Sequence, residues 1–167
     1  MNPPSLSTLS LSLEQGIAEI RLNRPDKSNA MNDAMWQEIR QAFDWVDATP
    51  EARVAILSGA GRNFCAGIDL TLLAGIQQRI AHPDAARSRE ALRRLILDLQ
   101  DCLSSVERCR KPVLAAIQGA CIGGALDLVT CCDMRYAAAD AVFSVREIDV
   151  GMVADVGTLQ RLPRLIG

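Results

Sequence analysis

The sequence predicts an α/β domain in which strands and helices alternate and the strands pair in parallel. Two strands and the helix between them support this fold class. The segment Ile17–Leu22 alternates in polarity, and residues 54–57 form a short apolar run that ends at Ser58-Gly59, as a buried strand would. Between them, apolar side chains recur at helical spacing before Pro50; these are Met31, Met35, Ile39, Phe43 and Val46.

The middle of the chain adds a loop, a polar segment and a second helix. Residues 64–70 form a glycine-containing loop. The polar segment 76–89, which contains Pro83, predicts a mobile excursion. A long amphipathic helix then precedes Lys111-Pro112, and its apolar positions are Leu92, Leu95, Ile96, Leu99, Leu103 and Val106.

The last third repeats the alternation. We expect a strand at Val113–Ile117, a glycine-bearing turn at 119–124, a short helix from Gly124 to about Thr130, and strands near 133–136 and 142–145.

A weak internal repeat connects the two halves. In each half a strand leads into a Gly-Ala pair, at 59–60 and at 119–120, and then into a loop that contains Gly67 or Gly123-Gly124. This pattern suggests repeated strand-strand-helix units. Because no linker divides the chain, residues 1–167 are expected to form one domain.

Composition excludes several function classes. The 167 residues are 49% hydrophobic and 23% charged, with a net charge of −2 and with Lys and Arg spread along the chain. This composition is ordinary for a soluble domain and predicts no nucleic-acid partner. The longest apolar runs are too short to span a bilayer, so no membrane partner is expected. The N-terminus has no basic start followed by an apolar stretch, which favours a cytoplasmic protein.

The cysteines and the single histidine argue against a metal site. The six cysteines form no C-x-x-C pair, and most have apolar neighbours, so we interpret them as reduced core residues. His82 lies in a polar loop and is the only histidine. A zinc site would need better-spaced ligands, and a Ser-His or Cys-His nucleophile is disfavoured.

Two glycine-containing segments are candidates for binding an oxyanion. Gly123-Gly124 opens a short helix, where backbone N–H groups are unpaired and glycine allows close approach to the backbone. Such a place can hold a thioester oxygen that becomes negative during a reaction. The loop at 64–69 could supply a second N–H donor. The glycine pair taken alone fits a tight turn at positive φ better.

Three carboxylates are candidates for acid–base chemistry. Asp127 lies among apolar residues one turn into the short helix. A charge there is costly unless it is paired or has a functional role, but a carboxylate in the first turn is also favoured by the helix dipole. Glu147 and Asp155 flank an apolar, glycine-containing stretch and could divide acid and base roles. Alternatively, Glu147 and Asp149 are solvated loop charges and Asp155 caps the next helix. Each feature alone is compatible with a domain that has no catalytic role. An enzyme is favoured only because the glycine pair, the loop and the carboxylates occur together.

Five stretches together resemble one family along nearly the whole chain. They read LNRPDKSNAM (22–31), NFCAGIDL (63–70), KPVLAAIQG (111–119), CIGG (121–124) and CDMRY (132–136). In these stretches the chain is similar to the crotonase (enoyl-CoA hydratase/isomerase) superfamily. The resemblance implies a crotonase-like (ClpP/crotonase) spiral of repeated strand-strand-helix units.

The resemblance also implies a site. It assigns an oxyanion hole to the N–H groups of Ile68 and Gly124. It implies a fatty acyl-CoA substrate, with CoA as part of the substrate, no permanently bound cofactor and no metal. The residues expected around CoA are Arg24, Lys27, Asn29, Ala30, Ala66, Gly67, Ile68, Asp69, Gly123 and Gly124.

The carboxylates indicate the subfamily. Typical hydratases have Glu at the positions of Asp127 and Glu147, and usually glycine at the position of Asp155. The stretch EIDVGMVADVGTLQRLP (147–163) instead resembles the Δ3,5-Δ2,4-dienoyl-CoA isomerases. That family uses Glu and Asp at the Glu147 and Asp155 positions, with the Asp127 equivalent nearby in the pocket.

The resemblance therefore implies that the chain shifts a 3,5-dienoyl-CoA to a 2,4-dienoyl-CoA in fatty acid β-oxidation. An enoyl-CoA hydratase and a non-catalytic acyl-CoA-binding protein are the alternatives. Family members continue beyond the position of Gly167 into a helical region that builds homotrimers, often paired into hexamers. On this basis residues 1–167 are expected to be a catalytic core truncated before that region.

Overall fold

The computed structural model describes residues 2–167, and a twisted five-stranded sheet organises them. The strand order is β1-β2-β3-β4-β6. The antiparallel pair β1–β2 is followed by parallel pairing through β3, β4 and β6. The bounds are β1 (Leu9–Glu14), β2 (Ile17–Leu22), β3 (Val54–Gly59), β4 (Val113–Ile117) and β6 (Met134–Ala137). The α/β class is confirmed, although the sequence analysis missed β1 and its antiparallel pairing.

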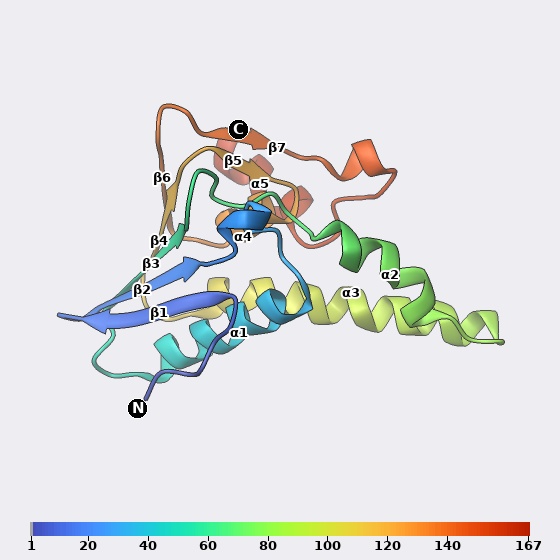
Figure 1. Ribbon diagram of the computed structural model, residues 1–167, viewed down its shortest axis with the longest axis horizontal. Coiled ribbons are helices and arrows are strands. Elements are labelled where there is room, and N and C mark those ends of the chain that lie inside the picture. Colours follow the sequence, from blue (N-terminus) through green and yellow to red (C-terminus); the bar gives the residue numbers. More distant parts are fainter. Residues whose placement is uncertain (1) are drawn as a thin grey trace.

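Two long helices, α1 (Asp33–Ala48) and α3 (Ala85–Arg108), lie together along one face of this sheet (Figure 1). The side chain of Asn32 accepts a hydrogen bond from the Met35 N–H and so begins α1. The apolar positions of α1 that the sequence spacing identified are all buried. The core thus fills the layer between the helices and the sheet.

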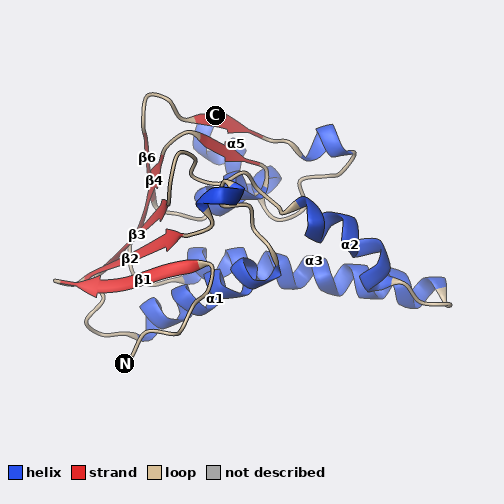
Figure 2. Cartoon of the chain, in the orientation of Figure 1, coloured by secondary structure: helices blue, strands red, loops and turns tan. Residues whose placement is uncertain are grey.

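A smaller layer lies over the carboxyl ends of β3 and β4 (Figure 2). It contains the parallel pair β5 (Ala120–Ile122) and β7 (Val142–Ser144), with α4 (Gly124–Thr130) and α5 (Thr158–Ile166) packed against each other. The segment 119–124 is therefore more than a turn, because β5 occupies its centre. Strand β5 pairs with β7, which begins 20 residues after β5 ends. No local sequence pattern reveals such a distant partner.

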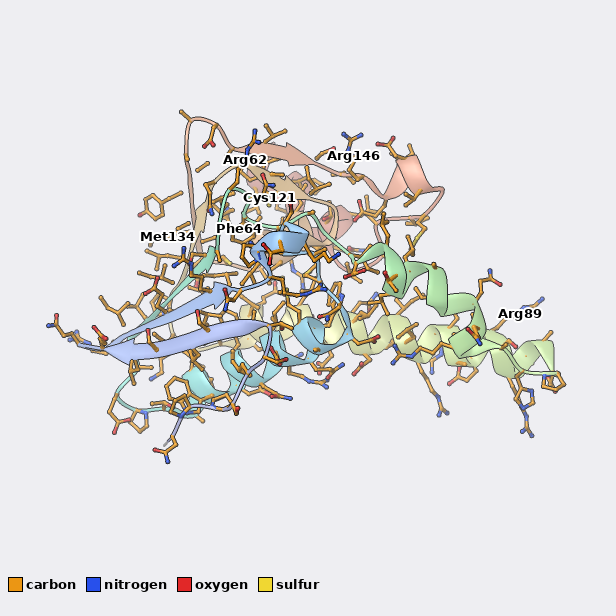
Figure 3. The ribbon with its side chains drawn as sticks, in the orientation of Figure 1. Arg62, Phe64, Arg89, Cys121, Met134 and Arg146 are labelled. Atoms are coloured by element: carbon orange, nitrogen blue, oxygen red, sulfur yellow. The ribbon has the colours of Figure 1, made fainter. Side chains whose placement is uncertain are left out.

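The two segments of the internal repeat lie side by side. The N–H of Cys65 donates to the carbonyl of Ala120, and the N–H of Ile122 donates to the carbonyl of Cys65. Phe64 and Cys121 lie in the interior where these segments meet, whereas Arg89 lies at the far end of α3 (Figure 3). The sequence repeat therefore corresponds to two adjacent strand–loop units.

The prediction of a mobile excursion at 76–89 is wrong. Helix α2 (Leu70–Ile80) extends into this segment and packs on α3, and the two helices form a hairpin that projects from the sheet (Figure 1). The Asp69 side chain accepts from the Thr71 N–H to begin α2, and the Asp84 side chain accepts from the N–H groups of Ala86 and Arg87 to begin α3. Pro83 is confined to the short turn between the helices.

Asn29 ties the segment after β2 to the loop after β3. It follows the short helix η1 (Pro25–Lys27), has a φ of 55° and is fully buried. Its Nδ2 donates to the carbonyls of Ala60, Asn63 and Phe64, and its Oδ1 accepts from the Arg24 N–H. One carboxamide thereby satisfies four backbone groups.

Replacing Asn29 should therefore be costly. In Asn29→Ala, three carbonyls, two of them buried, lose their donor, and we expect the free energy of unfolding in urea to fall by about 3 kcal/mol. Lys27→Ala, at an exposed neighbouring position, should change it by less than about 0.5 kcal/mol. Equal stability of the two variants would contradict this account of Asn29.

Candidate active site

An apolar pocket lies between the α2–α3 hairpin and the segment that connects β7 to α5. Its volume is about 490 Å³. The hairpin contributes aliphatic side chains, among them Leu73, Ile76, Leu92, Leu95, Ile96 and Leu99. Two acidic side chains, those of Glu147 and Asp155, lie in this lining. Such a pocket suits an apolar chain with a few polar groups that act on it.

Two residues whose backbone N–H groups are unpaired lie in the lining of this pocket. Ile68 and Gly124 both line it, and no acceptor for either N–H is found within residues 2–167. The loops approach closely, since a Cβ placed on Gly67 would lie 3.5 Å from the Gly124 nitrogen and 2.6 Å from the Ile122 carbonyl oxygen. The arrangement can accept an oxygen that develops negative charge.

Trp36 forms the floor beside this pair of N–H groups. The side chain comes from α1 and is 2% exposed. A Cβ placed on Gly124 would lie 3.5 Å from the Trp36 ring atom Cη2. The indole therefore contacts the same point of the backbone to which an oxyanion would bind.

Glu147 is positioned beside this site rather than in solvent. It begins the short helix η2 (Glu147–Val150), and its Oε1 would lie 3.4 Å from a Cβ on Gly123. Its Oε2 is buried and has no hydrogen-bond partner among the described residues. The alternative that Glu147 is a solvated loop charge is therefore wrong, although its neighbour Asp149 is exposed and pairs with Arg146.

Asp155 lines the pocket from the segment that precedes α5. Burial raises the pKa of its carboxyl above the ordinary value. It does not cap α5, because the residue at the N-cap position is Gly157. The capping alternative is therefore wrong. A carboxyl with a raised pKa in an apolar lining is suited to donate a proton.

Asp127 lies behind the pocket. It is fully buried in the first turn of α4, and its Oδ1 accepts a hydrogen bond from the Thr158 N–H at the start of α5. It does not line the pocket, in contrast to the place that the resemblance implied. Burial raises the pKa of Asp127 to about 6; Glu147 and Asp155 add to the rise, and the Thr158 hydrogen bond opposes it.

The residues expected around CoA separate into accessible and internal groups. Lys27 and Ala66 are exposed, and Ala30 is half-buried. Arg24 pairs with Asp69 at 3.0 Å and donates to the Ala30 carbonyl, which fixes the rim of the site. Gly67 and Gly123 bring the backbone close at positive φ. Asn29 has no accessible surface, so it holds the loop and contacts no ligand in this conformation.

The sequence analysis missed part of the apolar wall of the pocket. The α3 half of that wall was identified as helical, whereas the α2 half lies in the stretch that was interpreted as loop and mobile segment. The spacing of Leu73, Ile76 and Ile80 is helical and could have revealed it.

The described residues add three observations on other classes of site. No helix within residues 2–167 is long and apolar enough to cross a membrane. Within the same residues, no group of three or more His, Cys, Asp or Glu side chains is placed to hold a metal ion. The six cysteines are free, and all except the half-buried Cys109 are buried.

The raised pKa of Asp127 makes stability depend on pH. The folded protein holds this proton more tightly than the unfolded chain, whose ordinary value is 3.8. The stabilising contribution is complete below pH 3.8 and is lost as pH rises through about 6. Asp127→Asn keeps an acceptor for Thr158 but cannot ionise. The free energy of unfolding of Asp127→Asn relative to wild type should therefore rise by about 2 kcal/mol between pH 4 and pH 7.

Urea unfolding at several pH values measures this difference. Asp140→Asn, at an exposed position, is the matched control and should follow the wild type throughout. A constant difference between Asp127→Asn and wild type across this range would contradict the assignment.

Comparison with known proteins agrees with this geometry. Residues 12–167 match the family model described as enoyl-CoA hydratase/isomerase. The mitochondrial Delta(3,5)-Delta(2,4)-dienoyl-CoA isomerase of Homo sapiens is 47% identical over 93% of this chain and 48% of its own length. The peroxisomal isomerase of Arabidopsis thaliana is 45% identical over 98% of this chain and 59% of its own.

A solved structure shares the fold as well. An enoyl-CoA hydratase/carnithine racemase from Magnetospirillum magneticum superposes with a TM-score of 0.83 at 33% identity, over 98% of this chain and 58% of its own. The chain spans about half the length of the curated relatives it matches. The match to the family model, supported by the relatives and the shared fold, shows that this chain belongs to the enoyl-CoA hydratase/isomerase family.

Proposed function

We propose that the protein containing this chain isomerises 3,5-dienoyl-CoA to 2,4-dienoyl-CoA. The observation that carries the proposal is the presence of two carboxyl side chains, Glu147 and Asp155, in one apolar pocket beside two unpaired N–H groups. The relatives that are 45% and 47% identical, which are named as dienoyl-CoA isomerases, support it.

The proposed chemistry begins at the thioester carbonyl. Hydrogen bonds from the N–H groups of Ile68 and Gly124 polarise its oxygen and acidify the proton on C2. Glu147, whose Oε1 lies beside Gly123, removes this proton. The electron pair spreads over the diene as a dienolate, whose negative charge rests mainly on the thioester oxygen. The apolar lining lowers the local dielectric constant, which strengthens these interactions.

Asp155 completes the reaction at the other end of the diene. As a carboxylic acid it delivers a proton to C6, which leaves the double bonds at C2 and C4 in conjugation with the thioester. Burial raises the pKa of Asp155, which keeps the acid form available for this step. Because C2 and C6 are four bonds apart, two separate carboxyl groups serve better than one.

An enoyl-CoA hydratase needs a water beside its carboxylates, and a carboxyl at position 155 has no evident task in that reaction. Burying an ionisable group without a task costs free energy. The proposal therefore places the isomerase first.

The remaining features of the proposal concern ligands, assembly and location. CoA arrives and leaves as part of the substrate, and the apolar pocket is proposed to hold the acyl chain. We propose that no further cofactor takes part. Assembly into homotrimers or hexamers and a cytoplasmic location stay predictions; the relatives compared above carry mitochondrial and peroxisomal names.

The two carboxyl groups can be separated by substitution. In the full-length protein, Asp155→Asn should lower the rate of isomerisation about 10²–10⁴-fold, because the amide keeps the size and loses the proton. Glu147→Gln should lower it at least as much. Thioester binding should be nearly unchanged in both variants, and this is measured by titration with a CoA thioester.

Solvent deuterium exchange at C2 distinguishes the two roles. Asp155→Asn should still exchange the C2 proton, because Glu147 and the N–H pair remain, whereas Glu147→Gln should not. An Asp155→Asn variant that isomerises the diene at the wild-type rate, or a wild type that hydrates 2-enoyl-CoA and leaves the diene unchanged, would overturn the isomerase proposal.

A further inference from the structure

A second cavity lies on the opposite side of Asp155. Its volume is about 330 Å³, and it opens between α3 and α5. Gln100 and Ser104 of α3 face Gln160 and Arg161 of α5 across it. We refer to it as the α3–α5 cavity.

The residues Asp155 and Val156 line both cavities. The wall between the acyl pocket and the α3–α5 cavity is therefore formed by this short stretch of chain. Gln100 fixes the wall, since its Nε2 donates to the backbone carbonyl of Asp155 at 2.5 Å. Asp155 is thus placed between an apolar compartment and a polar one.

The charges around the α3–α5 cavity favour water over a charged ligand. Arg161 pairs with Glu107 at 2.6 Å, and Asp155 is uncharged in the acid form that the proposed reaction requires, so the exposed Arg164 is the remaining charge on the lining. A single exposed guanidinium is well solvated and gives the cavity little preference for a bound anion. The polar side chains and the volume of the cavity suit on the order of ten water molecules.

The proposed isomerisation leaves a proton imbalance that such a cavity can correct. In each turnover Glu147 gains the C2 proton and Asp155 loses one to C6. The enzyme is restored when Glu147 releases a proton to solvent and the Asp155 carboxylate takes one from solvent, so no net proton is consumed. Substrate and product fill the acyl pocket, which closes that route to Asp155.

We propose that the α3–α5 cavity is the water-filled route by which Asp155 regains its proton while the acyl pocket is still occupied. This inference rests on the proposed isomerase function. The polar faces of α3 and α5 then serve the reprotonation of Asp155 and do not take part in substrate binding. Substitutions in the cavity should therefore slow the reprotonation of Asp155 after each turnover. They should leave the rates of proton transfer at C2 and C6 in the first turnover unchanged.

Filling the cavity tests the proposal in the full-length protein. Ser104→Leu adds volume from α3, and Gln160→Phe adds it from α5, so one variant remains informative if the other does not fold. Ser104→Ala is the matched control, because it removes the hydroxyl without filling the space. Rapid mixing with excess 3,5-dienoyl-CoA, followed by the absorbance of the conjugated product, separates the first turnover from later ones.

We expect a filled variant to complete one turnover per site within twofold of the wild-type rate, and then to slow about tenfold. Its kcat/KM should be unchanged, and Ser104→Ala should behave as wild type. Folded filled variants that keep the wild-type steady-state rate would overturn the proposal, as would an equal loss in the first and later turnovers. If the wild type forms no 2,4-diene at all, the isomerase function itself fails.

Isotope transfer gives an independent measurement. A substrate labelled with deuterium at C2 should yield product whose C6 carries hydrogen from ordinary water. If deuterium appeared at C6, Asp155 would be receiving its proton from Glu147, and the cavity would have no role in that transfer.

Discussion

The close contact between two loop backbones is the constraint on which the site depends. The loop after β3 and the loop after β4 run side by side, and glycine is required where they touch. A Cβ on Gly67 would lie 2.6 Å from the Ile122 carbonyl oxygen, and one on Gly119 would lie 2.4 Å from the Arg62 carbonyl oxygen. Real Cβ atoms do not approach so closely, so any side chain there would force the loops apart. The N–H groups of the first loop and of α4 would then separate as well.

The carboxyl groups show how one fold places similar side chains in different environments. Glu147 and Asp155 reach the apolar pocket from the two ends of one connecting segment, whereas Asp127 is enclosed behind it. The hydrogen bond from Asp127 to the Thr158 N–H joins α4 to α5, and α5 follows directly after Asp155. Asp127 thereby positions the segment that carries the proposed acid. Burial disfavours the ionised form of both Asp127 and Asp155, so the pKa of each carboxyl lies above the ordinary value for aspartate.

The sequence was informative wherever local pattern and tertiary structure agree. The alternation in Ile17–Leu22 and the helical spacing between Met31 and Val46 correspond to observed elements, because each buries the face that its pattern defines. The placement of β5 was missed because its partner β7 is distant in sequence. The α2 helix was missed because its polar end and the nearby Pro83 resemble a loop, while its apolar side is covered by elements distant in sequence, chiefly α3.

The residues of the site also separate into those that sequence could identify and those whose position depends on tertiary packing. The pairing of the Ile68 and Gly124 N–H groups in one oxyanion site stays a prediction from the family resemblance, and neither residue type indicates it alone. Composition and spacing could not reveal that Asp127 lies behind the pocket or that Asp155 separates two cavities. Those properties depend on how α3, α4 and α5 pack, and packing of distant elements leaves no mark in a local window.

The position of Trp36 makes the site visible to spectroscopy. The chain has two tryptophans, and the Trp36 indole lines the apolar pocket against Gly124. Trp45 lies nine residues further along α1, more than two helical turns away. Indole emission responds to the polarity and the quenching groups around the ring. Any ligand that enters the pocket therefore changes the surroundings of the Trp36 indole and leaves those of Trp45 unchanged, so the emission of the chain's own tryptophans reports occupancy without an added label.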